Sequence, residues 1–165
     1  MDGYKRLIKE VPDFPIKGVN FKDISPLLAD QQMFLSAIAD MGRLVKNPDY
    51  WIGVDSRGYL FASAIAIQFG GGVVCARKEG KTPGDKISIT YDLEYGTATL
   101  ELQPGNGDVV IVDDVLATGG TLQATNDLAN KAGYNVLGNI VLVDLEYVPR
   151  IDNFNLDVRS VVQYG

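Results

Sequence analysis

Two adjacent carboxylates, followed at once by a loop of small and hydroxyl-bearing residues, form the stretch of this chain best suited to chemistry. Residues 109–121 read VVIVDDVLATGGT, and a helical pattern of apolar residues follows. The β-branched run 109–112 predicts a strand buried on both faces, as in a parallel sheet, that delivers Asp113 and Asp114 to the loop. Backbone N–H groups of the loop and of the helix N-terminus would then converge on one point, which favours an anion, most often a phosphate. The candidate phosphate-binding residues are Ala117, Thr118, Gly119, Gly120 and Thr121.

A second polar loop has the same relation to a strand and a helix. Residues 50–54 (YWIGV) predict a short apolar strand, and a helical pattern runs over about 59–69. Asp55, Ser56 and Arg57 lie between them, at the carboxyl end of a parallel strand, where open α/β sheets bind ligands. An arginine there can hold phosphate oxygens in bidentate fashion, or it can pair with Asp55 inside the protein.

The stretch 77–102 predicts a two-stranded antiparallel arm. It opens with the cations Arg77, Lys78 and Lys81 among glycine and proline, and apolar and polar residues then alternate on both sides of 91–96 (YDLEYG). One interpretation is a solvated hairpin. The functional alternative is a mobile lid whose cations meet an anionic ligand and which excludes water on closing.

The first 30 residues combine apolar side chains with prolines that prevent one long helix. Phe14, Ile16, Val19 and Phe21 are apolar, so this segment should pack on something. Composition alone favours a surface arm tucked over the core, because apolar stripes are usually packing. The functional alternative is a wall of a ligand pocket.

The remaining elements complete an α/β pattern. A helix is predicted from an N-cap at Asp30 to Asn47-Pro48, and the helix after residue 121 should end at Gly133. Further strands are predicted at 72–77, 136–145 and 158–164. Since strands alternate with helices, residues 1–165 are predicted to form one α/β domain with a mainly parallel central sheet flanked by helices.

The composition excludes several classes of function. The chain has 165 residues and a net charge of −6, which argues against general nucleic-acid binding. It has no histidine, which excludes Ser-His-Asp and Cys-His machinery and histidine metal sites. The single cysteine, Cys75, lies in an apolar run and is predicted to be buried. No signal peptide or membrane span is apparent, so we expect a cytoplasmic protein without a membrane partner.

Four ordered segments resemble motifs of the adenine phosphoribosyltransferase family, and the resemblance covers nearly the whole chain. PDFPIKGVNFKDISPLL resembles the base-binding arm, and VDSRGYLFA resembles the pyrophosphate-binding loop. ARKEGKTPG followed by YDLEYG resembles the flexible catalytic loop, and VVIVDDVLATGGTL resembles the ribose-phosphate loop of all type I phosphoribosyltransferases. The resemblance implies the type I fold, with a small N-terminal hood at about 1–30 and a flexible antiparallel β-arm at about 77–102.

The resemblance implies purine salvage: adenine and 5-phosphoribosyl 1-pyrophosphate would give AMP and pyrophosphate, in a homodimer with Mg²⁺. The metal would be held mainly through the substrate, with a contribution from Asp113 and Asp114. These carboxylates would also accept the ribose hydroxyls and favour positive charge in an oxocarbenium-like transition state. The pyrophosphate-binding residues would be Asp55, Ser56, Arg57, Arg77, Lys78 and Lys81.

The same resemblance assigns the base and the chemistry. Glu94 would transfer the proton at the purine ring beside Tyr95, and Arg57 and Lys81 would also act in catalysis. Phe21 and Leu145 would sandwich the ring, while backbone groups around 20–22 read the exocyclic amine. The base-binding residues would be Val19, Asn20, Phe21, Lys22 and Leu145.

One departure from the family's pattern concerns the base. Asn20 is polar where an apolar residue is expected. If the backbone reads the base, Asn20 is neutral; if its side chain meets the ring, preference could shift to another purine. Two other functions stay open: transfer to hypoxanthine, guanine, xanthine or a pyrimidine, and a non-catalytic purine-sensing regulator. Retention of Glu94, Tyr95 and Lys81 speaks against the regulator.

Overall fold

The apolar run 109–112 lies in the middle one of the five parallel strands of a seven-stranded sheet in the computed structural model, which describes residues 2–93 and 96–165. The strand order is β5-β6-β4-β3-β7-β8-β9; the strands from β4 to β9 are parallel, and β6 and β5 extend the sheet antiparallel. The strands are β3 (Tyr50–Val54), β4 (Gly72–Lys78), β5 (Ile87–Leu93), β6 (Gly96–Leu102), β7 (Asp108–Leu116), β8 (Asn135–Leu145) and β9 (Val158–Tyr164).

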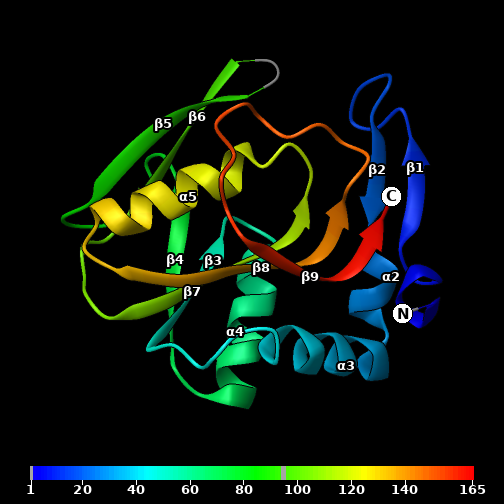
Figure 1. Ribbon diagram of the computed structural model, residues 1–165, viewed down its shortest axis with the longest axis horizontal. Coiled ribbons are helices and arrows are strands. Elements are labelled where there is room, and N and C mark those ends of the chain that lie inside the picture. The colour runs from blue at the N-terminus through cyan, green and yellow to red at the C-terminus, as the bar shows by residue number, and fades with distance from the viewer. Residues whose placement is uncertain (1, 94–95) are drawn as a thin grey trace.

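Helices cover both faces of this sheet (Figure 1). Helices α3 (Gln31–Gly42) and α4 (Gly58–Phe69) pack on one face, whereas α5 (Gly120–Lys131) lies over the other with the β5–β6 hairpin against it. Successive side chains of β7 alternate between the two cores: Val110 and Val112 join the first, and Val109 and Ile111 join the second. The prediction of a strand buried on both faces, and of the α/β class, is confirmed.

The N-terminal segment forms a small hood beside the carboxyl end of β9, so that the two chain termini lie close together (Figure 1). Strands β1 (Lys9–Pro12) and β2 (Asn20–Asp23) pair antiparallel in a separate sheet. The short helices α1 (Asp2–Lys5) and α2 (Ser25–Ala29) flank this sheet in sequence. The hood predicted from the resemblance is thus present.

Two local predictions were wrong in detail. The helix capped by Asp30, whose carboxylate accepts the Met33 N–H at 3.0 Å, ends at Gly42 and does not continue to residue 47. The chain leaves the helix there because Val45 packs on the first core beside Gly138 of β8. Cys75, predicted to be buried, is only half-buried.

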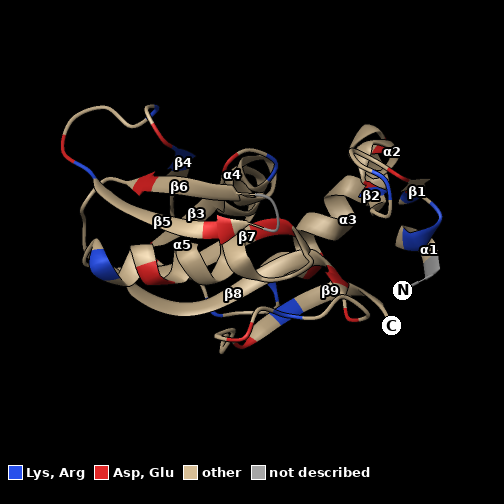
Figure 2. Ribbon diagram, turned by 90° about the horizontal axis from the view of Figure 1, so that it is seen from above, with Lys and Arg blue, Asp and Glu red and all other residues tan. Residues whose placement is uncertain are grey.

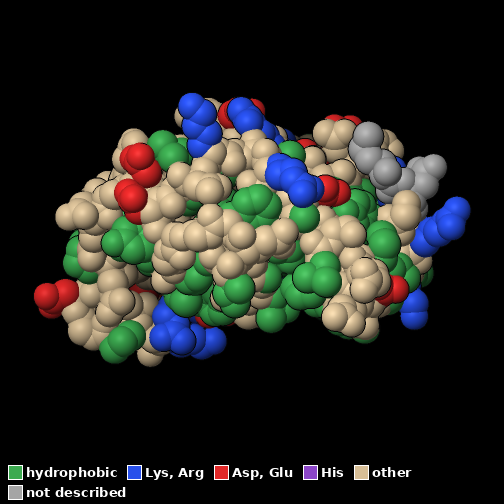
Figure 3. Space-filling view, turned by 90° about the horizontal axis from the view of Figure 1, so that it is seen from below, with side chains coloured by type: hydrophobic (Ala, Val, Ile, Leu, Met, Phe, Trp, Pro, Cys, Tyr) green, Lys and Arg blue, Asp and Glu red, His purple; other side chains and the backbone are tan. Residues whose placement is uncertain are grey.

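The surface carries apolar side chains on the helical face that holds α3 and α4. Hydrophobic side chains are visible between charged ones across the lower face of the molecule (Figure 3). Leu35 of α3 and Leu60 and Ile67 of α4 are exposed, and Ile67 is 88% accessible. Among residues 2–93 and 96–165, no helix has the length and apolar character needed to cross a membrane.

Candidate active site

A cavity of about 470 Å³ opens at the carboxyl ends of β3 and β7. These strands are neighbours, but β4 lies on the far side of β3 and β8 on the far side of β7, so the strand order reverses between them. Open α/β sheets bind ligands at such a reversal. The predicted site residues that line the cavity are Val19, Asn20, Phe21, Lys22, Asp55, Ser56, Arg57, Lys78, Asp113, Asp114, Ala117, Thr118, Gly119, Gly120, Thr121 and Leu145.

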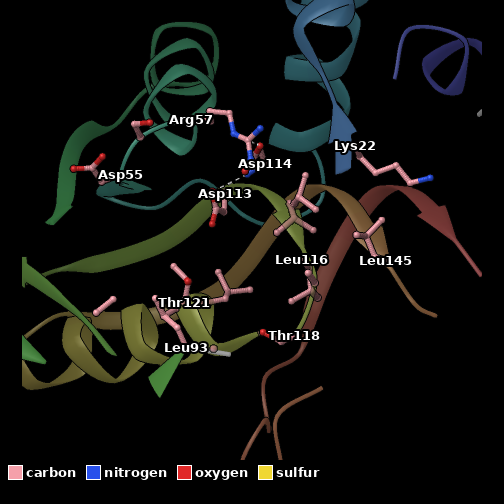
Figure 4. A pocket seen from close by; sticks show the side chains of 18 of the residues that line it. Lys22, Asp55, Arg57, Leu93, Asp113, Asp114, Leu116, Thr118, Thr121 and Leu145 are labelled. Atoms are coloured by element: carbon pink, nitrogen blue, oxygen red, sulfur yellow. Dashed lines mark hydrogen bonds and ion pairs between the residues drawn. The ribbon is translucent and has the colours of Figure 1, made fainter. Parts of the chain in front are cut away.

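The loop after β7 has the geometry of an anion cradle. Gly119 adopts a left-handed conformation with φ of 86°, and a Cβ there would stand 2.5 Å from the Phe154 ring, so only glycine fits. Helix α5 begins at Gly120, and its first N–H groups have no partner within the helix. Thr118 and Thr121 project beside this helix start (Figure 4). The loop therefore presents backbone donors, a helix N-terminus and two hydroxyls to the cavity.

The segment after β8 supports this loop, a role that no sequence pattern predicted. The Arg150 guanidinium donates to the carbonyl oxygen of Ala117 and pairs with Asp144. The Ile151 N–H donates to the carbonyl oxygen of Thr118 at 2.9 Å. These contacts engage the carbonyl oxygens of Ala117 and Thr118, so two acceptors that would oppose an anion at this loop are already paired.

The paired carboxylates belong to β7 itself and do not follow its end. Asp114 is buried, and its Oδ2 lies 2.7 Å from Nε of Arg57; its backbone N–H donates to Oδ1 of Asp113 at 2.9 Å. Burial, and then the neighbouring charge of Asp114, raise the pKa of the Asp113 carboxyl well above its usual value. The pair therefore favours any cation or hydroxyl donor that enters the cavity.

Arg57 connects the carboxylates to the N-terminal hood. The alternative partner considered from the sequence, Asp55, is wrong: Arg57 pairs with Asp114, and its guanidinium lies 5.1 Å from the Phe21 ring centroid. Asp55 instead accepts the backbone N–H of Lys78 at 3.2 Å and lies 3.6 Å from Nζ of Lys81. Figure 4 shows the Arg57 side chain directed at Asp114, above the cavity.

The predicted cations of the arm are distributed unevenly. Lys78 lines the cavity, whereas Arg77 and Lys81 are not among its lining residues. The Arg77 guanidinium donates to the carbonyl oxygen of Lys81 at 3.0 Å, and its Nε is buried with no partner among the described residues. The segment that carries Lys81 projects from the sheet between β4 and β5 (Figure 2). Lys81 is nevertheless tied to the site through Asp55.

The wall of the cavity formed by Phe21 and Leu145 is apolar. Phe21 packs edge-to-face on Phe14 with centroids 5.2 Å apart, and Leu145 is buried at the end of β8. The Lys22 side chain extends away from Asp113 and Asp114 (Figure 4). The Asn20 amide donates to Glu10 at 3.3 Å. With both polar side chains engaged elsewhere, the backbone of 20–22 is what remains for polar contacts with a ligand.

Several lining residues were missed from the sequence, and two predicted ones lie outside the described residues. Tyr91 and Leu93 of β5 and Leu116 of β7 line the cavity, and the Tyr91 hydroxyl lies 3.2 Å from the Thr121 hydroxyl. The alternation of the arm predicted that one face would be apolar, but not that this face covers the loop after β7. Glu94 and Tyr95 lie outside the described residues.

The oxygen donors suit a hard cation that brings most of its own ligands. Among the described residues there is no group of three or more side chains able to hold a metal. Asp113 and Asp114 offer carboxylate oxygens at the cavity, and within the described part of the chain Oδ2 of Asp114 is engaged by the Arg57 ion pair. Mg²⁺ usually keeps several waters and binds through one or two carboxylates plus phosphate oxygens, so these residues fit it.

Comparison with known proteins agrees with this geometry. The family model described as the phosphoribosyl transferase domain matches residues 23–150. The adenine phosphoribosyltransferase of Hydrogenovibrio crunogenus is 46% identical, over 95% of this chain and 94% of its own; that of Bdellovibrio bacteriovorus is 45% identical, over 97% and 98%.

Solved structures give the same result. Adenine phosphoribosyltransferase from Thermoanaerobacter pseudethanolicus superimposes with a TM-score of 0.88 at 38% identity, covering 99% of both chains. The Saccharomyces cerevisiae enzyme, solved with an imino-altritol bisphosphate and adenine, gives 0.84 at 32% identity over 96% of both chains. This chain therefore belongs to the adenine phosphoribosyltransferase family.

Proposed function

We propose that this chain transfers the 5-phosphoribosyl group of 5-phosphoribosyl 1-pyrophosphate to adenine, giving AMP and pyrophosphate. The observation that carries the proposal is that one cavity is lined by an anion-binding loop, paired carboxylates and an apolar base-side wall. The related yeast structure holds adenine, and a Giardia lamblia relative at 30% identity holds 9-deazaadenine.

The phosphate loop fixes one end of the substrate. The N–H groups of 118–121, the start of α5 and the hydroxyls of Thr118 and Thr121 would bind the 5′-phosphate. The Tyr91 hydroxyl lies 3.2 Å from the Thr121 hydroxyl. It would either bind the phosphate together with Thr121 or leave Thr121 free to bind it. Arg150, which contacts the Ala117 carbonyl oxygen and is not among the lining residues of the cavity, would keep the loop in this shape.

The carboxylates act on the ribose. Asp113 and Asp114 would accept hydrogen bonds from its hydroxyls, since ionised carboxylates are acceptors only. As the bond between C1′ and the pyrophosphate oxygen breaks and a bond from C1′ to the purine nitrogen forms, positive charge develops on the ribose. The negative charge of the two carboxylates would stabilise that positive charge.

The leaving group requires cations. Lys78 lines the cavity, and Arg57 lies between Asp114 and Phe21 with further N–H donors that can bind pyrophosphate oxygens. Lys81, held 3.6 Å from Asp55, would add charge by a small movement of its loop. Mg²⁺, held by Asp113 and Asp114 together with the substrate, would neutralise part of the charge of the departing pyrophosphate.

The base would lie between Phe21 and Leu145. The engagement of Asn20 with Glu10 supports the interpretation in which Asn20 is neutral and the backbone reads the base. We retain Glu94 as the group that accepts the proton released from the purine nitrogen, with Tyr95 beside it. This assignment rests on the resemblance of YDLEYG to the family's catalytic loop.

The cytoplasmic location and the homodimer also belong to this proposal. The exposed residues Leu60 and Ile67, one above the other on α4, supply apolar surface for a second copy of the chain. Light scattering on the wild-type protein and on Ile67→Lys tests the dimer; a wild-type monomer would contradict it.

A turnover assay with a panel of bases tests the function. With 5-phosphoribosyl 1-pyrophosphate and Mg²⁺, adenine should give a higher kcat/KM than hypoxanthine, guanine or xanthine, and chelation of the metal should stop the reaction. Faster turnover of another purine would replace adenine as the substrate. Binding of 5-phosphoribosyl 1-pyrophosphate without turnover of any base would favour the sensing regulator.

A further inference from the structure

We propose that Glu10 is a positioning residue for the purine, because it holds the two walls of the base site in register. This inference rests on the proposed function and deepens it. Glu10 does not line the cavity. It also lies outside the four family-like motifs, two residues before the first of them begins at PDFP. Its carboxylate nevertheless joins Lys22 and Asn20, the two residues that flank Phe21.

The register of the hood explains why one carboxylate contacts both residues. Glu10 lies directly opposite Lys22 across the β1–β2 pair, and Asn20 is opposite Pro12, two residues along the same face. Successive strand residues point to opposite faces, so Asn20 and Lys22 share the Glu10 face while Phe21 points the other way. Phe21 is there in contact with Phe14 and Arg57. Glu10 therefore fixes the strand from behind the aromatic wall.

Lys22 carries this connection to the other wall. Its side chain is buried, pairs with Glu10 and places Nζ 4.1 Å from the centroid of the Tyr164 ring. Tyr164 pairs with Leu145 in the β8–β9 ladder, and its carbonyl oxygen accepts the Glu146 N–H at 2.8 Å. Glu10, Lys22 and Tyr164 thus form a bridge from the strand of Phe21 to the strand end of Leu145.

The different exposure of the Glu10 and Lys22 side chains determines the expected effect of removing the Glu10 carboxylate. The Glu10 side chain is 55% exposed, so solvent screens this end of the ion pair and limits the loss of global stability when Glu10 is removed. The Lys22 side chain is only 2% exposed, and a buried ammonium group without its carboxylate partner is costly. Lys22 should therefore turn toward water in the absence of Glu10, which would move β2. The consequence is a displaced Phe21 in a protein that still folds, with the phosphate loop unaffected.

The test compares Glu10→Ala, Glu10→Gln and the matched surface control Asp157→Ala, an exposed carboxylate outside the cavity lining. In Glu10→Ala the KM for adenine should rise about 5- to 10-fold, as expected for roughly 1 kcal/mol. The KM for 5-phosphoribosyl 1-pyrophosphate and kcat should stay within about 2-fold of the wild type. Every kinetic constant of Asp157→Ala should stay within the same range of about 2-fold, as is usual for a surface substitution. Glu10→Gln should be intermediate, since its amide oxygen still accepts from Asn20 and Lys22.

A binding measurement separates this inference from the proposed function. By calorimetry, Glu10→Ala should weaken the binding of AMP and leave the binding of ribose 5-phosphate unchanged. This measurement needs no turnover. Lys22→Met should weaken the binding of AMP by a similar factor. The double variant Glu10→Ala/Lys22→Met should lose little further affinity for AMP, because both residues act through one bridge.

Equal weakening of AMP and ribose 5-phosphate, or no weakening of AMP, would overturn the role of Glu10. If Glu10→Ala does not fold, the same criteria apply to Glu10→Gln. A wild-type protein that turns over a different purine would refute adenine alone, and the role of Glu10 is then judged by the KM for that purine.

Discussion

Gly58→Ala should destabilise the protein and lower its activity, although alanine is the better helix former. Gly58 is the first residue of α4, where that helix crosses β7 beside the paired carboxylates. A Cβ at this position would stand 2.6 Å from the carbonyl oxygen of Val112 and 3.3 Å from Oδ1 of Asp113. The first contact is with backbone, so no side chain can turn aside to relieve it.

Two opposing terms set the magnitude. Alanine in place of glycine within a helix is worth about 0.5–1 kcal/mol in its favour. Overpacking of a buried contact costs about 1–3 kcal/mol, and a backbone neighbour places this case at the upper end. The net loss should be about 2 kcal/mol, which lowers Tm by roughly 4–8 °C for a domain of this size. Because relief moves Arg57 relative to Asp114, kcat/KM should also fall, by up to about 10².

Thermal unfolding and steady-state kinetics on Gly58→Ala measure both effects. Gln68→Ala, an exposed residue of the same helix outside the apolar pair Leu60 and Ile67, is the matched control and should leave Tm and kcat/KM near the wild type. A Gly58→Ala protein that is as stable and as active as the wild type would refute the close approach of α4 to β7 as the reason for glycine.

Three further predictions concern the carboxylates and the arm. Burial, and then the neighbouring Asp114, raise the pKa of Asp113 in the folded protein. Its contribution to the free energy of unfolding is therefore complete below the pKa that Asp113 has in the unfolded chain, and it is lost as pH rises through the pKa in the folded protein. Without ligand, Asp113→Asn should therefore gain in Tm over the wild type as pH rises from acid to neutral; a constant difference would contradict the shift. Tyr91→Phe removes the hydroxyl that lies 3.2 Å from the Thr121 hydroxyl, and should change the KM for 5-phosphoribosyl 1-pyrophosphate by about 2- to 10-fold, the value of one hydrogen bond, with adenine KM unmoved. Glu94→Gln should bind 5-phosphoribosyl 1-pyrophosphate normally and lose about 10²–10⁴ in kcat; wild-type turnover would remove Glu94 from the mechanism.

Patterns that depend on local sequence predicted the fold well. The run 109–112 identified an interior strand of the sheet because four consecutive apolar residues need cover on both faces. Asp30 marked the start of α3, since a cap acts within one turn. The end of that helix was misplaced because Val45 is held by packing on β8, a contact that lies far away in sequence.

Side-chain partners were much harder to predict than segments. The sequence placed Arg57 at a ligand-binding strand end, but its partner Asp114 comes from the neighbouring strand, 57 positions along the chain. Arg150 had no local signal, because its role depends on carbonyl groups that β7 and its loop bring to it. Sequence periodicity shows which face a residue occupies, but only the folded sheet shows what lies opposite.

The central claim is that one cavity joins an adenine to a phosphoribosyl group. The most direct measurement is to incubate the wild-type protein with adenine, 5-phosphoribosyl 1-pyrophosphate and Mg²⁺, and to quantify both products in the same sample. AMP and pyrophosphate should appear in equal amounts as adenine disappears. Pyrophosphate released without AMP, or adenine left unconsumed while another base is converted, would contradict the claim.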